Sequence, residues 1–177
     1  MEMHFASVWE TISDHIPDEP ALICDDDIKT WKEYDERAAK LAFFLNEKSI
    51  SNDSKVGLYL HNSNEYLEAQ FATFKVEGVP INVNYRYVEE ELIYLLDNSD
   101  SEVVFFQSSY SERIKKIADK LPKIKAFIQV GGKDLLDLKN CYMYEEIISK
   151  NPPLERKTRS EDNIYMLYTG GTTGMPK

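Results

Sequence analysis

The chain has 177 residues, and its 21 Lys and Arg against 31 Asp and Glu give a formal net charge of −10. That length suits about one domain, and the hydrophobic (42%) and aromatic (12%) contents suffice for a packed core, which excludes wholesale disorder. The negative charge argues against a nucleic-acid binder, because such a protein presents a basic surface.

The chain begins with a segment that has the apolar period of a helix. Residues 5–15 are predicted to be helical, with Pro17 just beyond the end. A short strand at 21–24 and an acidic turn at 25–27 follow. The apolar residues on one face of the helix are Phe5, Val8, Trp9 and Ile12.

Thr30 and Glu33 have the spacing of a capping box, in which each side chain accepts a hydrogen bond from the other residue's amide. Residues 56–60 are continuously apolar, which predicts a strand buried on both faces. Residues 61–63 then form a turn and cap for the next helix, which we expect to end near Gly78. The helix that starts after Thr30 has one apolar stripe: Trp31, Tyr34, Ala38, Leu41 and Leu45.

The second half of the chain repeats this alternation. Pro80 lacks an amide donor, so its strand belongs at a sheet edge or at a strand start. Ser109 and Glu112 have the spacing of a second capping box. Strands are predicted at 79–83, 103–106, 126–130 and 164–168, and helices at 88–98, from 109 toward 122, and at 142–149. Buried strands that alternate with helices predict an α/β fold of layered, mostly parallel sheets flanked by helices.

The sequence also limits where the protein acts. No apolar run approaches the roughly 20 residues that span a bilayer, and residues 1–4 lack the start of a secretory signal. Cys24 and Cys141 are isolated, so neither a disulfide framework nor a zinc site is indicated. We therefore expect a cytoplasmic protein without a transmembrane segment.

Three other features are interpreted as structural. His61 is a turn residue, and residues 85–87 lead into a helix. A local group of lysines is interpreted as a solvated helix face, which leaves peripheral membrane contact open: Lys115, Lys116, Lys120, Lys123 and Lys125.

The densest cluster of special residues is 168–177, which reads Tyr-Thr-Gly-Gly-Thr-Thr-Gly-Met-Pro-Lys. Glycines let backbone amides approach a ligand closely, and successive amides can form an anion-binding concavity. Threonine hydroxyls and Lys177 add donors and a positive charge. The order matches neither the P-loop nor the dinucleotide fingerprint. We predict polyphosphate binding, with a purely structural Gly/Thr turn as the alternative.

This decapeptide resembles the phosphate-loop signature of adenylate-forming (AMP-binding) enzymes, roughly Tyr-Thr-Ser/Gly-Gly-Thr-Thr-Gly-x-Pro-Lys. Residues 29–34 and 74–82 are similar to two earlier segments of that family. Residues 82–92 and the Gly170-Gly171 variant look most like acyl-CoA synthetases that act on fatty or steroid-type acids. The resemblance covers essentially the whole chain and implies the N-terminal domain of the synthetase fold, in incomplete form.

The resemblance implies a two-step ligase reaction. ATP and a small-molecule carboxylic acid, a fatty acid in the leading interpretation, form an acyl-adenylate, and coenzyme A then displaces AMP. By position, the residues expected to hold the ATP phosphates are Thr169, Gly170, Gly171, Thr172, Thr173, Gly174 and Lys177. The resemblance also implies Mg²⁺, which Thr169 would contact.

In this family the adenine-contacting segment, the acidic Mg²⁺ ligand and the C-terminal domain with its catalytic lysine lie beyond the phosphate loop. We therefore expect residues 1–177 to be the N-terminal portion of an adenylation domain, truncated at that loop, without the C-terminal domain and inactive alone. Two alternatives stay open: another adenylate-forming enzyme, such as an amino-acid-activating or luciferase-like one, or a non-catalytic binding or scaffold protein. The acyl chain and the oligomeric state are not determined by the sequence.

Overall fold

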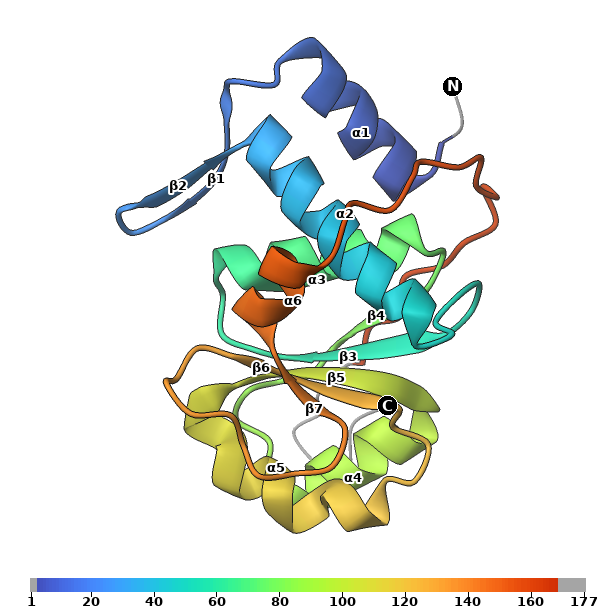
Figure 1. The fold of residues 1–177 in the computed structure, drawn as a ribbon. Helices are drawn as coiled ribbons and strands as arrows, with labels where there is room; N and C mark the ends of the chain where they lie inside the picture. Colours follow the sequence, from blue (N-terminus) through green and yellow to red (C-terminus); the bar gives the residue numbers. More distant parts are fainter. Residues whose placement is uncertain (1–2, 169–177) are drawn as a thin grey trace.

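The computed structural model describes residues 3–168, which form one parallel sheet between two layers of helices (Figure 1). The α-helices are α1 (Phe5–His15), α2 (Trp31–Glu47), α3 (Asn64–Lys75), α4 (Glu89–Asn98), α5 (Ser111–Ile117) and α6 (Tyr144–Lys150). The strands are β1 (Pro20–Cys24), β2 (Asp27–Thr30), β3 (Lys55–Tyr59), β4 (Val79–Asn82), β5 (Ser101–Gln107), β6 (Ala126–Val130) and β7 (Cys141–Met143). Short 3₁₀ turns lie at Ser108–Tyr110 and Ala118–Lys120.

The main sheet has the order β4-β3-β5-β6-β7, and every neighbouring pair is parallel. A separate antiparallel hairpin, β1–β2, projects from the body (Figure 1). The predicted α/β fold class is therefore confirmed.

Each face of the sheet has its own core. On one face, helices α2, α3 and α6 cover the sheet, with α1 packed outside α2 and α3, and on the other face lie α4 and α5 (Figure 1). Strand residues supply both cores alternately: Phe105 belongs to the first, and Phe106 to the second. Both of these side chains are completely buried. The continuous apolar strands follow from this burial on both faces.

The first capping box is present. Glu33 N donates to Thr30 Oγ1 at 3.2 Å, and Thr30 N donates to Glu33 Oε2 at 2.8 Å. Most of the predicted stripe of α2 is buried, with only Trp31 at the border. Ser63 caps α3 as expected, since its hydroxyl accepts a hydrogen bond from Tyr66 N.

The prediction of a second capping box at Ser109 and Glu112 is wrong. Helix α5 begins at Ser111 after a 3₁₀ turn over Ser108–Tyr110, and no side chain caps it. The hydroxyl of Ser111 donates to the carbonyl of Ser108 instead. The sequence also missed β7, a three-residue strand that directly precedes α6 and that we had assigned to the helix.

The predicted strand at 164–168 is reduced to a single parallel bridge between Ile81 and Met166. The amides of Val79 and Val83 donate toward the β3 side, to Ser54 and Leu58. Alternate residues of a parallel strand point to opposite sides, so Pro80 faces the 164–168 segment and has no N–H to offer it. The edge position predicted for Pro80 is confirmed, and it explains why the ladder there is so short.

The structure differs from two local expectations, the buried face of α1 and the end of α3. The residues that α1 buries are Ala6, Glu10 and Ser13, while the predicted apolar face is only partly covered. Helix α3 ends at Lys75, and the residue with positive φ is Glu77 (63°), not Gly78. A Cβ on Gly78 would lie 3.0 Å from the carbonyl oxygen of Ser54, so this glycine serves close backbone approach.

Candidate functional site

The sheet order creates a point at which the chain turns to opposite faces. After β3 the chain enters α3 on one face, and after β5 it enters α5 on the other. In open parallel sheets, ligands bind outside the carboxyl ends of the strands at such a topological switch point. The loops that follow β3, β4 and β5 are therefore the candidate site.

A buried tyrosine organises these loops. The hydroxyl of Tyr59, at the end of β3, lies 3.0 Å from the carbonyl oxygen of Tyr87 and 3.2 Å from that of Tyr85. Arg113 on α5 donates to the Tyr59 hydroxyl and, at 2.9 Å, to the carbonyl of Tyr87. Burial raises the pKa of Tyr59, although Arg113 opposes that effect. The carbonyls of Tyr85 and Tyr87 therefore anchor these loops, while the purely structural role that we predicted for residues 85–87 stays a prediction, because both tyrosine side chains also line a cavity.

His61 lies beside this network on the surface. Its ring stacks near the ring of Tyr110, with centroids 5.4 Å apart, and near that of Tyr85, at 4.8 Å. Its Nε2 atom is 2.8 Å from the hydroxyl of Tyr110. Tyr110 thus joins the β5 loop to the β3 loop, and His61 is an exposed turn residue, as expected.

A cavity of about 330 Å³ opens at the carboxyl ends of β3 and β4. Among residues 3–168, its lining combines four tyrosines and three asparagines and includes no charged side chain: Tyr66, Tyr85, Tyr87, Tyr168, Asn62, Asn82 and Asn84. Aromatic faces and amide groups suit an uncharged, partly planar portion of a ligand. A second cavity, of about 400 Å³, lies between the β1–β2 hairpin and the start of α3 and is mostly apolar, with Cys24 and Leu67 in its wall.

Tyr168 connects the cavity to the predicted phosphate-binding residues. Its hydroxyl donates to Asn98 Oδ1 at 2.8 Å, and its side chain belongs to the cavity wall. Thr169, Gly170, Gly171, Thr172, Thr173, Gly174 and Lys177 lie outside the described residues. Across residues 3–168, no group of three His, Cys, Asp or Glu side chains is placed to hold a metal ion.

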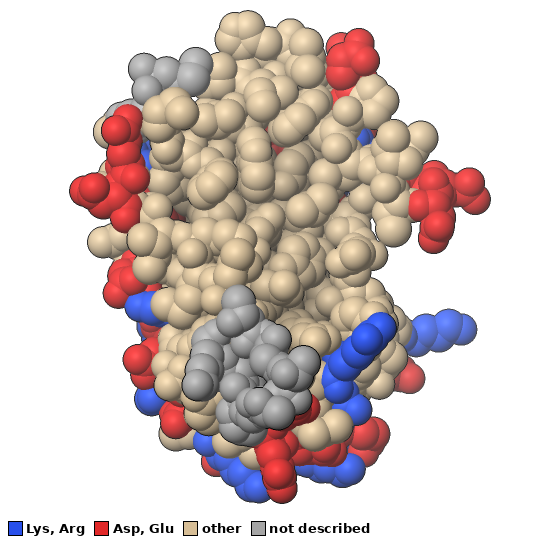
Figure 2. Space-filling view, turned by 180° about the vertical axis from the view of Figure 1, so that it is seen from behind, with Lys and Arg blue, Asp and Glu red and all other residues tan. Residues whose placement is uncertain are grey.

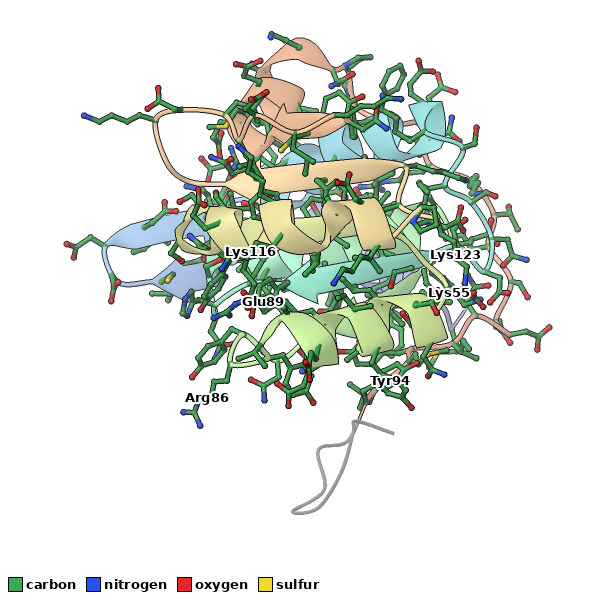
Figure 3. All side chains as sticks on the ribbon, turned by 90° about the horizontal axis from the view of Figure 1, so that it is seen from below. Lys55, Arg86, Glu89, Tyr94, Lys116 and Lys123 are labelled. Atoms are coloured by element: carbon green, nitrogen blue, oxygen red, sulfur yellow. The ribbon has the colours of Figure 1, made fainter. Side chains whose placement is uncertain are left out.

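Three lysines of the group predicted to form a solvated face, Lys116, Lys123 and Lys125, lie within ion-pair distance of carboxylates. Lys116 on α5 faces Glu89 at the start of α4, with 3.4 Å between Nζ and Oε1 (Figure 3). Lys123 lies 3.0 Å from Asp97 and 2.8 Å from Asp100. These pairs support the interpretation of a solvated face. No helix within the described part of the chain is long and apolar enough to cross a bilayer.

Charge is distributed unevenly over the surface. Figure 2 shows one face whose upper and central parts carry few Lys, Arg, Asp or Glu side chains, with charged residues gathered along its lower edge and sides. Ile164 and Leu167 are more than half exposed, at 52% and 59%, on the segment that approaches the cavity.

Residues 9–177 match a family model described as AMP-binding enzyme. The chain is 38% identical to a 3-oxocholest-4-en-26-oate–CoA ligase of Rhodococcus rhodochrous, over 100% of this chain and 32% of that protein. It is 36% identical to a medium/long-chain-fatty-acid–CoA/3-oxocholest-4-en-26-oate–CoA ligase of Mycobacterium marinum, over 99% of this chain and 33% of that protein.

The fold has close structural counterparts. The anthranilate CoA ligase AuaEII, solved with anthranoyl-AMP, superposes with a TM-score of 0.90 at 20% identity, over 99% of this chain and 34% of that one. The chain therefore spans about a third of the length of the proteins that it matches.

Proposed function

The chain belongs to the AMP-binding enzyme family, and from that premise we propose that it forms the N-terminal part of an ATP-dependent acyl-CoA synthetase. The resemblance of residues 168–177 to the phosphate loop of adenylate-forming enzymes agrees with this family assignment. The observation that carries the proposal is the 38% identity, over the full chain, to a protein named as a CoA ligase.

The proposed reaction joins a carboxylic acid to coenzyme A in two steps. The carboxylate oxygen attacks the α-phosphorus of ATP and releases pyrophosphate, which leaves an acyl-adenylate. The thiol of coenzyme A then attacks the acyl carbon and releases AMP. Because the relatives' names include fatty and steroid acids, a hydrophobic acid is the proposed substrate class.

The role proposed for this chain is to hold the departing pyrophosphate. The hydroxyls of Thr169, Thr172 and Thr173, the neighbouring glycine amides and the ammonium of Lys177 form a donor set that fits the β- and γ-phosphates. Negative charge grows on these phosphates as the bond to the α-phosphorus breaks, so fixed donors stabilise the transition state more than the ground state. Mg²⁺ would supply further charge compensation, with Thr169 as its proposed contact.

The position of the segment that leads to Thr169 supports this role. The segment before Thr169 reaches the carboxyl ends of β3 and β4, where Tyr168 belongs to the wall of the tyrosine and asparagine cavity. That cavity suits a neutral portion of a substrate rather than its phosphates. The expected cytoplasmic location stays a prediction.

Calorimetric titration of the 177-residue chain with Mg²⁺·ATP tests the proposal. We expect binding that falls roughly tenfold or more in Lys177→Ala, since the substitution removes a charge-assisted contact to phosphate, and that persists in Lys133→Ala, an exposed lysine on another loop. Absence of binding by the parent chain, or equal binding by Lys177→Ala, would contradict it. We expect no acyl-dependent exchange of pyrophosphate into ATP by the chain alone, and such exchange would show that these residues suffice for adenylation.

A further inference from the structure

The segment that leads to Tyr168 is held by side chains rather than by a backbone ladder. We call residues 151–168 the connector; it contains a bend, one turn and the single bridge at Met166. One of its few long-range backbone hydrogen bonds runs from Leu154 N to the carbonyl of Ala39, at 2.9 Å. Its course therefore depends on specific side-chain contacts.

Arg159 makes the most buried of these contacts. Its Nη1 atom donates to Glu10 Oε2 at 2.7 Å, and its Nη2 atom donates to Glu10 Oε1 at 2.9 Å. The Nε atom also reaches the carbonyl of Lys75 at 3.3 Å. The Arg159 side chain is 1% exposed and that of Glu10 is 6% exposed. A bidentate guanidinium–carboxylate pair of this kind fixes orientation as well as distance.

The pair is part of a balanced ionic cluster. Lys75 Nζ lies 2.7 Å from Glu10 and 2.5 Å from Asp35. Arg156 of the connector lies 2.7 Å from both Asp14 and Asp35. The cluster thus contains three carboxylates and three cations, which joins the connector to α1, α2 and α3.

The helices do not need this cluster in order to pack. Trp9 of α1 lies edge-on to Phe71 of α3, with ring centroids 5.1 Å apart, and Tyr34 of α2 packs on the same ring at 4.9 Å. Buried ion pairs add little net stability compared with apolar replacements, but they impose a defined geometry. Without Arg159 the connector would lose its buried contact with Glu10 of α1, while the helices would keep their aromatic contacts with one another.

We propose that Glu10 and Arg159 form a clasp that closes the connector onto the helical layer, so that the connector opens locally when the clasp is removed while the sheet stays folded. The proposed function assigns no role to either residue, and the clasp does not depend on that function. Its consequence is that this one buried pair makes a large contribution to the free energy of connector opening, beside the more exposed ion pairs of Arg156 and Lys157.

Cleavage of the chain by endoproteinase Lys-C tests the clasp directly. This protease cuts after lysine, and Lys157 lies two residues before Arg159, so substitution of Arg159 leaves the cleavage site intact. With protease dilute enough that closing is faster than cutting, the cleavage rate reports the population of the open connector. Arg159→Met removes the guanidinium and keeps a long side chain, while Glu10 and Asp35 both stay within ion-pair distance of Lys75.

We expect cleavage after Lys157 to become roughly 100-fold faster in Arg159→Met, because the removal of one partner of a buried ion pair is strongly destabilising, with cleavage after Lys55 in β3 unchanged. Arg159→Lys, which keeps the charge but loses the fork, should give an intermediate rate with the fold intact. The matched control is Glu146→Gln, which breaks an exposed pair with Lys150 just before the connector and should change neither rate.

Two results would overturn the clasp. One is cleavage after Lys157 at the parent rate in both Arg159 variants. The other is a parallel rise after Lys157 and Lys55 in Arg159→Lys, which would mean that the pair supports the whole fold rather than the connector.

Discussion

The Nε atom of Arg37 lies 2.9 Å from Oε1 of Glu68, a carboxylate whose side chain is completely buried. The other carboxylate oxygen of Glu68 accepts a hydrogen bond from the hydroxyl of Tyr144. Arg37 also pairs with Glu145 at 2.7 Å. One guanidinium therefore joins α2 to α3 and α6. Burial raises the pKa of Glu68, and Arg37 is the main opposing influence.

Arg37→Met should destabilise the protein in a pH-dependent way. Without the guanidinium, the pKa of Glu68 rises further above its usual value of 4.5, so the ionised form is penalised in the folded state. That penalty is present above the folded pKa and disappears as the pH falls toward 4.5. We expect a loss of about 3 kcal/mol at pH 7.5 and a smaller loss at pH 5, measured by urea unfolding.

The double variant Arg37→Met/Glu68→Gln is the control for this interpretation. It removes the buried charge together with its partner, so most of the stability at pH 7.5 should return and the extra pH dependence should vanish. An equal loss for Arg37→Met at both pH values would mean that the guanidinium acts by packing alone.

The two Ser/Thr-x-x-Glu sequences should respond differently to alanine. Thr30→Ala removes a hydroxyl that accepts a hydrogen bond from Glu33 N, which should cost about 1 kcal/mol of unfolding free energy. Ser109→Ala should change it by less than about 0.5 kcal/mol, because Ser109 lies within a 3₁₀ turn and caps no helix. Thermal and urea unfolding of both variants measure the difference, and equal losses would contradict the assignment.

This contrast indicates what the sequence could predict. Local spacing located both candidate helix starts, but it could not reveal that Tyr110 turns toward His61, which is 49 positions away in the chain, or that the helix begins at Ser111. Contacts between distant segments also explain why the buried face of α1 was predicted wrongly: the apolar period placed Phe5, Val8, Trp9 and Ile12 in the core. The structure buries Glu10 there, because its partners Lys75 and Arg159 come from distant segments.

The strands and the sheet type were predictable because burial on both faces leaves a continuous apolar run, as in β5 and β6. Strand β7 was not predictable, because three residues are too few to show the period of a strand and so to separate it from α6. For the candidate site, motif chemistry indicated polyphosphate binding, and the resemblance to adenylate-forming enzymes implied the individual residues; both stay predictions. The tyrosine and asparagine cavity had no sequence signal, because its lining residues come from several separate loops.

The two cysteines should differ in reactivity. Burial raises the pKa of the Cys141 thiol to about 11, so it is almost entirely protonated at pH 7.5, and the thiolate is the reactive form. Cys24 is half-buried on the β1–β2 hairpin. We expect Ellman's reagent to modify one thiol per folded chain, two after denaturation, and none rapidly in folded Cys24→Ser. Rapid reaction of both thiols in the folded protein would contradict this prediction.

Glu77 should make the connector sensitive to acid. Partial burial raises the pKa of its carboxyl, but Lys157 and the amide of Ser160 outweigh burial, so the pKa in the folded protein is lower than 4.5. A lowered pKa means that the stabilisation is fully present above about 4.5 and is lost as the pH falls through the folded value. Glu77→Gln keeps the length of the side chain and removes its charge.

At pH 7, Glu77→Gln should lose roughly 1 kcal/mol, since it weakens hydrogen bonds to a charged group at a partly exposed position. At pH 3 the difference from the parent should shrink, because the parent carboxyl is then losing its own charge. Urea unfolding at the two pH values measures this, with Glu155→Gln, an exposed position of the same connector, as the control that should show little loss at either. A difference that stays constant from pH 7 to pH 3 would mean that the Glu77 side chain stabilises the turn through its neutral contacts, and that the ion pair with Lys157 contributes nothing measurable.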